Sequence, residues 1–298
     1  MVKKTIVSLV ACAMLAMPAS ALAVDYADVL FIVDESGSMD TEHNWIGGMV
    51  LDLESALTAA NVGSGAEGNR YGLVGFTDYS GANGTPAGEY VRQIQVGGGQ
   101  WGTAAELDAA TSNFVLQGSD EDGYLAIDYA LNNYSTRGGA GLNVIFITDE
   151  DREDWSDVDN INDVLASLNN RNAILNAAVD ATYNSDNHTS GVIGIDGAGN
   201  AYVADGSGGF ITDTGGFVAS DDGSTEEDYL DLAWPTGGAG WDLNILRDGG
   251  TDAESFTAAF IDIKVGEIQQ QDPTNPVPVP AAVWLLGSGL MGLAGLRR

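Results

Sequence analysis

Residues 27–38 read Ala-Asp-Val-Leu-Phe-Ile-Val-Asp-Glu-Ser-Gly-Ser, and this stretch decides the fold. Its first seven residues form a nearly continuous apolar run of strand length, which is typical of a strand buried on both faces of a parallel sheet. The run ends at Asp34, and a short polar loop with two serines follows. Leu142–Thr148 repeats the pattern, because it is a second apolar run that ends directly before Asp149.

Predicted strands and helices alternate along the rest of the chain. Apolar residues at helical spacing predict helices, and shorter apolar or alternating segments predict strands. The predicted helices cover Trp45–Ala60, Thr103–Leu116, Tyr124–Leu131, Val158–Leu168 (capped by Ser156 or Asp157), Glu226–Trp234 and Ala253–Ile268. The further predicted strands are Tyr71–Phe76, Tyr90–Val96, Ile174–Tyr183 and Trp241–Leu246. This alternation predicts an α/β fold with a doubly wound, mostly parallel sheet flanked by helices.

One segment breaks the alternation. Residues 184–225 are rich in Gly and Asp and contain three short strand-like pieces, at 191–195, 201–204 and 209–212. We interpret this segment as an insertion of β-hairpins within one domain that covers residues 24–268.

The composition is strongly acidic. Among 298 residues, 43 Asp and Glu face 11 Lys and Arg, so the formal net charge is −32. Nucleic acid is a poor partner for such a surface, because phosphate binding needs a cationic footprint. Hydrophobic residues make up 44% and aromatic residues 8%, which is enough for a large core and excludes an acidic disordered chain. Cations are the natural partners of this charge.

The N-terminus has the pattern of a secretory signal in residues 1–23. Lys3 and Lys4 precede an apolar stretch, and Ala21-Leu22-Ala23 is typical of a cleavage site. Leu9-Val10-Ala11-Cys12 resembles a lipobox, but the apolar stretch before it is too short for that alternative. Cys12 is the only cysteine, so the exported product would contain none.

The C-terminus carries a second targeting pattern. A polar linker, 269–276, leads to Val277-Pro278-Val279-Pro280, and the apolar residues 281–296 end at Arg297 and Arg298. Sixteen uncharged residues are slightly short for a bilayer span, but Trp284 and the terminal arginines favour a transmembrane segment. A plain membrane anchor is the alternative to a processed signal.

Residues 277–298 resemble the PEP-CTERM sorting signal in its V-P-x-P-A-A-x-W-L variant. The departure is Val-Pro-Val-Pro in place of Pro-Glu-Pro. The resemblance implies a Gram-negative bacterium in which signal peptidase and an exosortase process the chain. The acidic body would then be anchored transiently by its C-terminal segment, reach the periplasmic face, and end at the cell surface or in the extracellular matrix.

Two acidic loops follow the two apolar strands. Ligands of doubly wound sheets bind beyond the carboxyl ends of the strands, where Asp34, Ser36, Ser38 and Asp149 are expected. Carboxylate and hydroxyl oxygens are hard donors, which favour Mg²⁺, Mn²⁺ or Ca²⁺ over zinc or copper. The neutral hydroxyls leave the ion electrophilic, so it could accept a carboxylate from a partner. A capped turn without metal is the alternative for this loop.

Three motifs resemble the von Willebrand factor type A domain. They are Phe31–Met39 (FIVDESGSM), Ile145–Asp149 (IFITD), and Leu232-Ala233 with Thr236-Gly237-Gly238. The resemblance implies a Rossmann-like sheet with a metal-ion-dependent adhesion site, or MIDAS, at its top. Mg²⁺ is the first choice of cation, and Ca²⁺ and Mn²⁺ are the alternatives. The departure is loop 118–123, where acids replace the usual threonine and resemble the integrin β-subunit loop. Either Asp120 or Glu121 would complete the site, and the added carboxylate would favour Ca²⁺.

Further acids flank the predicted site. Asp40 and Glu42 after the first motif, with Asp151, Glu153 and Asp154 after the third, could together hold a second cation, and a solvated rim of charge is the alternative. The run 221–228 is acidic too, but it lacks the 12-residue spacing of an EF-hand loop.

Sequence patterns typical of enzymes are missing. The chain has two histidines, His43 and His188, and neither a G-x-S-x-G elbow, an H-E-x-x-H motif nor a phosphate-binding P-loop. We therefore expect a non-enzymatic protein whose divalent cation captures an acidic group of a protein or exopolysaccharide. The alternative is a passive, cation-loaded matrix or surface-layer component without a defined ligand.

Overall fold

The computed structural model describes residues 24–79, 90–118, 120–153 and 160–271. The predicted signal 1–23, the sorting segment 277–298 with its apolar residues 281–296, and Asp154 lie outside these ranges. Within them, no helix has both the length and the apolar character that a bilayer crossing needs.

A mostly parallel sheet forms the centre of the molecule. Its strands are β1 (Ala27–Asp34), β2 (Arg70–Phe76), β3 (Val91–Ile94), β5 (Gly141–Ile147), β6 (Ala173–Val179) and β12 (Ala239–Asp242). They lie in the order β3-β2-β1-β5-β6-β12, and all adjacent pairs are parallel except β2 with β3. The two-residue strand β4 (Trp101–Gly102) also pairs antiparallel with β2. The predicted doubly wound α/β fold is confirmed.

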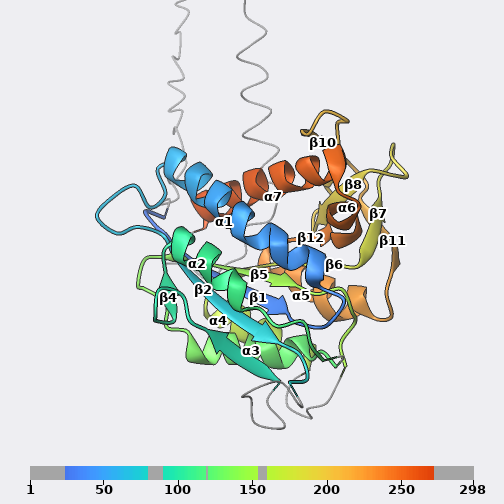
Figure 1. Cartoon of the computed structure of the whole chain (residues 1–298). Helices are drawn as coiled ribbons and strands as arrows, with labels where there is room; N and C mark the ends of the chain where they lie inside the picture. The colour runs from blue at the N-terminus through green and yellow to red at the C-terminus, as the bar shows by residue number, and fades with distance from the viewer. Residues whose placement is uncertain (1–23, 80–89, 119, 154–159, 272–298) are drawn as a thin grey trace, which may run out of the picture.

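Helices cover both faces of the sheet (Figure 1). One face carries α1 (Asp40–Ala59), α2 (Ala104–Ala110) with the 3₁₀ turn Thr111–Asn113, α6 (Leu243–Asp248) and α7 (Gly250–Gln270). The other carries α3 (Gly123–Asn133), α4 (Ile161–Asn170), and a π-helical turn Glu226–Leu230 that continues into α5 (Asp231–Ala233) and a 3₁₀ turn Trp234–Thr236.

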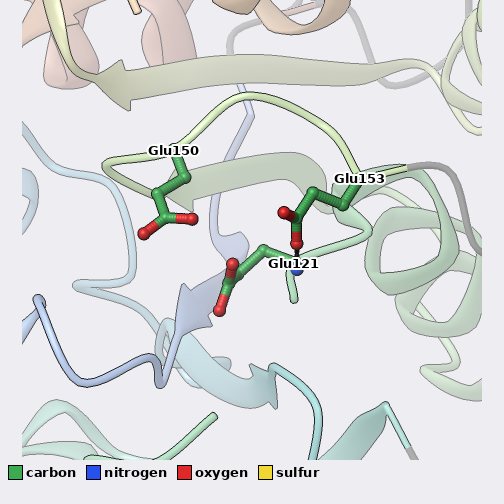
Figure 2. A group of neighbouring side chains, drawn as sticks. All are labelled: Glu121, Glu150 and Glu153. Carbon is green, nitrogen blue, oxygen red and sulfur yellow. Dashed lines mark hydrogen bonds between the residues drawn. The ribbon is translucent and has the colours of Figure 1, made fainter. Parts of the chain in front are cut away.

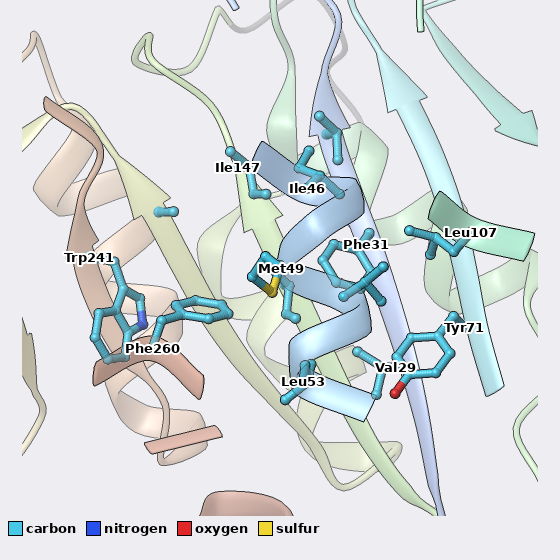
Figure 3. Packing of buried hydrophobic residues seen from close by; sticks show 14 of the residues in the cluster. Val29, Phe31, Ile46, Met49, Leu53, Tyr71, Leu107, Ile147, Trp241 and Phe260 are labelled. Carbon is cyan, nitrogen blue, oxygen red and sulfur yellow. The ribbon is translucent and has the colours of Figure 1, made fainter. Parts of the chain in front are cut away.

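Alternate side chains of β1 enter two separate cores. Val29, Phe31 and Val33 pack under α1 and α7, whereas Leu30 and Ile32 pack under α3 and α4. Figure 3 shows the first core, in which aromatic and aliphatic side chains of the sheet meet those of α1 and α7. Because successive side chains of a strand point to opposite faces, a strand between two helix layers must be apolar throughout, as the sequence pattern indicated.

The segment 184–225 extends the same sheet. Its strands are β8 (Val192–Asp196), β9 (Ala201–Ala204), β10 (Phe210–Asp213) and β11 (Phe217–Asp221). β8 pairs antiparallel with β12, β9 and β10 continue outward, and β11 pairs with β7 (Ala181–Asn184). The hairpins therefore lengthen the sheet on the side away from β3.

Some predicted boundaries were wrong. The strand expected at Trp241–Leu246 ends at Asp242, whose side chain accepts a hydrogen bond from the Asn244 backbone N–H at 3.0 Å and so caps α6. Leu243–Leu246 are consequently helical. The strand expected at Ile174–Tyr183 is interrupted at Asp180, between β6 and β7.

Helix ends also differed from the predictions, because polar caps and buried polar residues do not follow an apolar stripe. The helix expected from Trp45 begins at Asp40, and the helix expected over Thr103–Leu116 ends at Ala110. α4 begins at Ile161, where the Asn160 side chain accepts from the backbone N–H groups of residues 162 and 163. The caps predicted at Ser156 and Asp157 lie outside the described residues.

Candidate metal centre

The candidate site lies where the strand order reverses. β1 and β5 are parallel neighbours, and the chain continues to β2 on one side and to β6 on the other. Val33 is in register with Ile147, so the residues that follow each of them emerge side by side at the carboxyl edge. This crevice is the usual ligand site of an open α/β sheet.

A continuous set of short contacts joins the predicted ligands there. Ser36 Oγ lies 3.0 Å from Ser38 Oγ, and Ser38 Oγ donates to Asp149 Oδ1 at 3.1 Å. Asp34 Oδ1 accepts from the Ser36 backbone N–H at 2.6 Å, and Asp34 Oδ2 accepts from Thr148 Oγ1 at 2.8 Å. The structure thus brings Asp34, Ser36, Ser38 and Asp149 together. Ser38 is exposed, so the cluster opens to solvent.

Glu35 fixes the loop from the side opposite to Asp34. Its carboxylate is buried and accepts from Arg92 Nε at 2.7 Å and from the Val115 backbone N–H at 2.8 Å. Its own backbone N–H donates to Phe76 O at 2.9 Å. Sequence patterns do not indicate this role, because Arg92 and Val115 lie far from Glu35 along the chain. Glu35 is therefore a positioning residue of the loop.

His43 supports the same loop from α1. Its Nε2 lies 2.7 Å from Asp34 O, and its ring stacks on Phe114 at 4.3 Å between centroids. His43 therefore has a structural role in positioning the loop. His188 lies in the inserted segment, 3.0 Å from Asp213 Oδ2.

The structure separates the two acids of loop 118–123. Glu121 is fully buried and accepts from Thr77 Oγ1 at 3.1 Å, and the Asp34 charge acts on it. Asp120 is partly exposed, and its charge contributes to the raised pKa of Glu153 instead. Glu121 is thus the acid that lies beside the Asp34 cluster. Thr77, directly after β2, was not predicted, since a single threonine after a strand has no distinctive pattern.

The site concentrates negative charge in a buried place. Burial raises the pKa of Asp34 to about 7, although bonds from Ser36 and Thr148 act in the opposite direction, and Asp149 adds to the increase. Burial, with Asp34 and Glu150 close by, also raises the pKa of Glu121. Glu121 Oε2 is buried without a hydrogen-bond partner among the described residues. A set of oxygen donors with excess negative charge fits a hard divalent cation.

One cationic side chain reaches this cluster from the other end of the chain. Arg247 of α6 donates from Nη2 to Asp149 Oδ2 at 2.5 Å, and it also pairs with Glu42. Arg247 thereby neutralises part of Asp149. No sequence signal marked it, because it is separated from Asp149 by 98 positions.

The acids predicted to hold a second cation belong to different networks. Asp40 is exposed at the start of α1, and Glu42 is occupied by Arg247. Asp151 accepts from the backbone N–H of Ser224 at 3.2 Å. Among the described residues the acids that do come together are Glu121, Glu150 and Glu153 (Figure 2). Sequence reasoning had named Glu121 for the first centre and Glu153 for a second cation, but it missed Glu150 and this grouping, because the three residues meet only through the fold.

Comparison with known proteins gives distant structural likenesses. No protein-family model and no curated protein matches the chain. Among solved structures, it is similar to proximal thread matrix protein 1 from the mussel byssus, with a zinc-occupied MIDAS motif (15% identity, TM-score 0.39). It is also similar to a von Willebrand factor type A protein from Catenulispora acidiphila (17% identity, TM-score 0.36). Each likeness covers 53% of this chain, but only 37% and 34% of the other chains.

Proposed function

We propose that this protein is an exported binding protein that uses a divalent cation to capture an acidic group of its partner. The observation that carries the proposal is the meeting of Asp34, Ser36, Ser38 and Asp149 at the switch point, with contacts of 3.0 and 3.1 Å between their oxygens. These four residues, with Glu121 completing the set, would hold the ion. The motif resemblance to the von Willebrand factor type A domain supports the same assignment.

The oxygen donors of the site suit a divalent cation that binds an anionic group. A bound Mg²⁺, Ca²⁺ or Mn²⁺ supplies a Lewis-acidic position that a partner's carboxylate can fill. Ser36 and Ser38 contribute no charge, so they keep that position attractive to an anion, whereas Glu121 reduces the attraction. Thr148 and the Ser36 backbone N–H orient Asp34. We propose Mg²⁺ as the resident ion and a binding role without catalysis.

The two chain ends support a location. Residues 1–23 have the pattern of a secretory signal, and residues 277–298 resemble the PEP-CTERM signal. We propose export by signal peptidase, processing by an exosortase, and a final position at the cell surface or in the matrix of a Gram-negative bacterium. The partner is then an exposed protein acid or an acidic exopolysaccharide.

Calorimetric titration of Mg²⁺, Mn²⁺ and Ca²⁺ into the purified, metal-stripped full chain tests the site. We expect saturable Mg²⁺ binding that is lost in Asp34→Ala and kept in Asp196→Asn, a control at a buried aspartate on the opposite edge of the sheet. Weak binding of many ions per chain, unchanged in Asp34→Ala, would instead support the alternative of a passive matrix component.

Partner capture has its own measurement. Immobilised alginate, a polymer of sugar carboxylates, should retain the chain in the presence of Mg²⁺ and release it on chelation. The Asp34→Ala variant should pass unretained. Equal retention of the two proteins would disprove cation-mediated capture.

Export is tested by mass spectrometry of the protein collected outside cells of a host that has an exosortase. We expect the mature chain to begin after Ala23 and to lack residues 281–298. Secreted protein that keeps either end would contradict the proposed processing.

A further inference from the structure

Three glutamates meet beside the candidate metal centre. Glu121 precedes α3, whereas Glu150 and Glu153 follow β5, and each contributes a carboxylate oxygen to a set in which all lie within 4.8 Å of one another (Figure 2). The backbone fixes the approach of the two loops. The Glu153 N–H donates to Glu121 O at 2.9 Å, and the Glu121 N–H donates to Glu153 Oε2 at 3.0 Å.

The burial of Glu121 makes this cluster different from a solvated acidic patch. Glu121 is 0% exposed, and its Oε2 has no hydrogen-bond partner among the described residues. Glu150 and Glu153 are partly buried at its rim. A buried carboxylate oxygen without a donor is costly, so a native structure that keeps one usually satisfies it with an ion or a group from outside.

The surrounding charges do not relieve this cost. The charged neighbours that act on Glu150 are Asp149, Asp151 and Asp222, and those that act on Glu153 are Asp120, Glu150 and Asp151. Arg152 lies on the same loop, but its guanidinium pairs with Asp122 at 2.9 Å and stacks over Tyr124. A side-chain hydrogen bond joins Glu121 to Glu150, and burial raises the pKa of both carboxyls, so a proton balances the pair in the absence of metal. A divalent cation would replace that proton and neutralise all three carboxylates together.

We propose that Glu121, Glu150 and Glu153 bind a second divalent cation, and that this cation is Ca²⁺. Calcium takes six to eight oxygen ligands in flexible geometry, so it accepts three carboxylates at one site. Magnesium keeps several waters and usually binds through one or two carboxylates, so a set of three favours calcium. The Ca²⁺ site shares Glu121 with the proposed first centre but uses neither Asp34, Ser36 nor Ser38. Ca²⁺ binding can therefore be tested separately from Mg²⁺ binding.

The two sites meet at Glu121. One of its oxygens accepts from Thr77 on the Asp34 side, and the other is the unpartnered atom that the second ion would satisfy. Calcium at this place would hold Glu121 still and neutralise it. The first ion would then attract a partner's carboxylate more strongly than it would beside a Glu121 that keeps its full negative charge.

Calcium binding to the purified full chain, measured by equilibrium dialysis in saturating Mg²⁺, tests the site. We expect one Ca²⁺ per chain in the wild-type protein and in Asp34→Asn. We expect Glu150→Gln/Glu153→Gln to lose it, with an affinity at least about 100-fold lower. The control Asp252→Asn/Glu254→Gln removes the same charge from the exposed start of α7 and should bind Ca²⁺ normally.

Folding of the glutamine variant is checked by its thermal unfolding without metal. Removing two like charges should keep or raise its unfolding temperature, and added Ca²⁺ should no longer raise it. Normal Ca²⁺ binding by the glutamine variant would overturn the proposal, as would loss of all Ca²⁺ binding in Asp34→Asn. Loss of Mg²⁺ binding alone would affect only the first centre.

Discussion

The carboxyl edge of the parallel strands and the antiparallel insertion are both rich in aspartate, yet they treat these acids in opposite ways. In the insertion, Asp213 accepts from Ser185 Oγ at 2.7 Å and from Asn187 Nδ2 at 2.8 Å, and these donors lower its pKa. At the parallel edge, burial outweighs the donors and raises the pKa of Asp34 to about 7. The number of hydrogen-bond donors for each buried carboxylate therefore distinguishes the two cases. Asp213 has enough donors to stabilise its charge within a turn, whereas Asp34 does not and is suited to binding a cation.

The strongest test of this contrast replaces one aspartate by alanine in each region and compares the two variants. Asp34→Ala should lower Mg²⁺ affinity by at least ~100-fold, because it removes a carboxylate of the proposed centre. Asp213→Ala should leave Mg²⁺ affinity unchanged and should lower the free energy of unfolding, because several donors lose their acceptor. Calorimetry and denaturant unfolding measure both quantities, and a similar Mg²⁺ response in the two variants would refute the distinction.

The pH dependence of stability should also separate the regions. Between pH 4 and 7 the unfolded chain has ionised Asp34 while the metal-free native state still holds its proton, since the pKa is about 7 instead of 3.8. Stability should therefore fall as pH rises through this window, by roughly 3 kcal/mol, and the raised pKa of Glu121 carries the fall to higher pH. Asp213, with its lowered pKa, acts oppositely and loses stability only as pH falls below about 4.

Saturating Mg²⁺ provides the control for that measurement. A bound cation keeps Asp34 ionised in the native state, so the loss of stability between pH 4 and 7 should disappear. Thermal unfolding at several pH values, with and without Mg²⁺, measures the difference. Identical pH profiles under the two conditions would show that Asp34 does not bind the ion.

A smaller change in Mg²⁺ affinity is expected when the positive charge of Arg247 is removed. Arg247→Met removes the guanidinium that lies 2.5 Å from Asp149, so Mg²⁺ should meet less competition and bind about 10-fold more tightly. Arg70→Met is the matched control, because Arg70 pairs with Asp28 at the start of β1, at the opposite end of that strand from Asp34. Weaker Mg²⁺ binding in Arg247→Met would mean that Arg247 positions Asp149 and does not compete for it.

The sequence was sufficient for the parts of the molecule that local patterns determine. The apolar runs at 27–33 and 142–148 placed β1 and β5 within a residue, and their adjacency follows from the switch-point geometry. β12 and α6 were merged because Asp242 ends one element and caps the next within a single residue. Glu121 could not be separated from Asp120, since burial decides between neighbours with the same chemistry. Arg247 and the three-glutamate cluster depend on contacts between distant segments.

The register of β1 against β5 has a consequence for how the chain reaches its native state. Val33 lies opposite Ile147, and a slip of two residues would displace Asp34 from Asp149 by about 7 Å along the strands. A slip of one residue would turn the side chains to the wrong helix layer. Only the native alignment brings the four oxygen donors together, so an ion bound there would stabilise the correct strand pairing during refolding. Metal binding would thus select the native register of the central sheet.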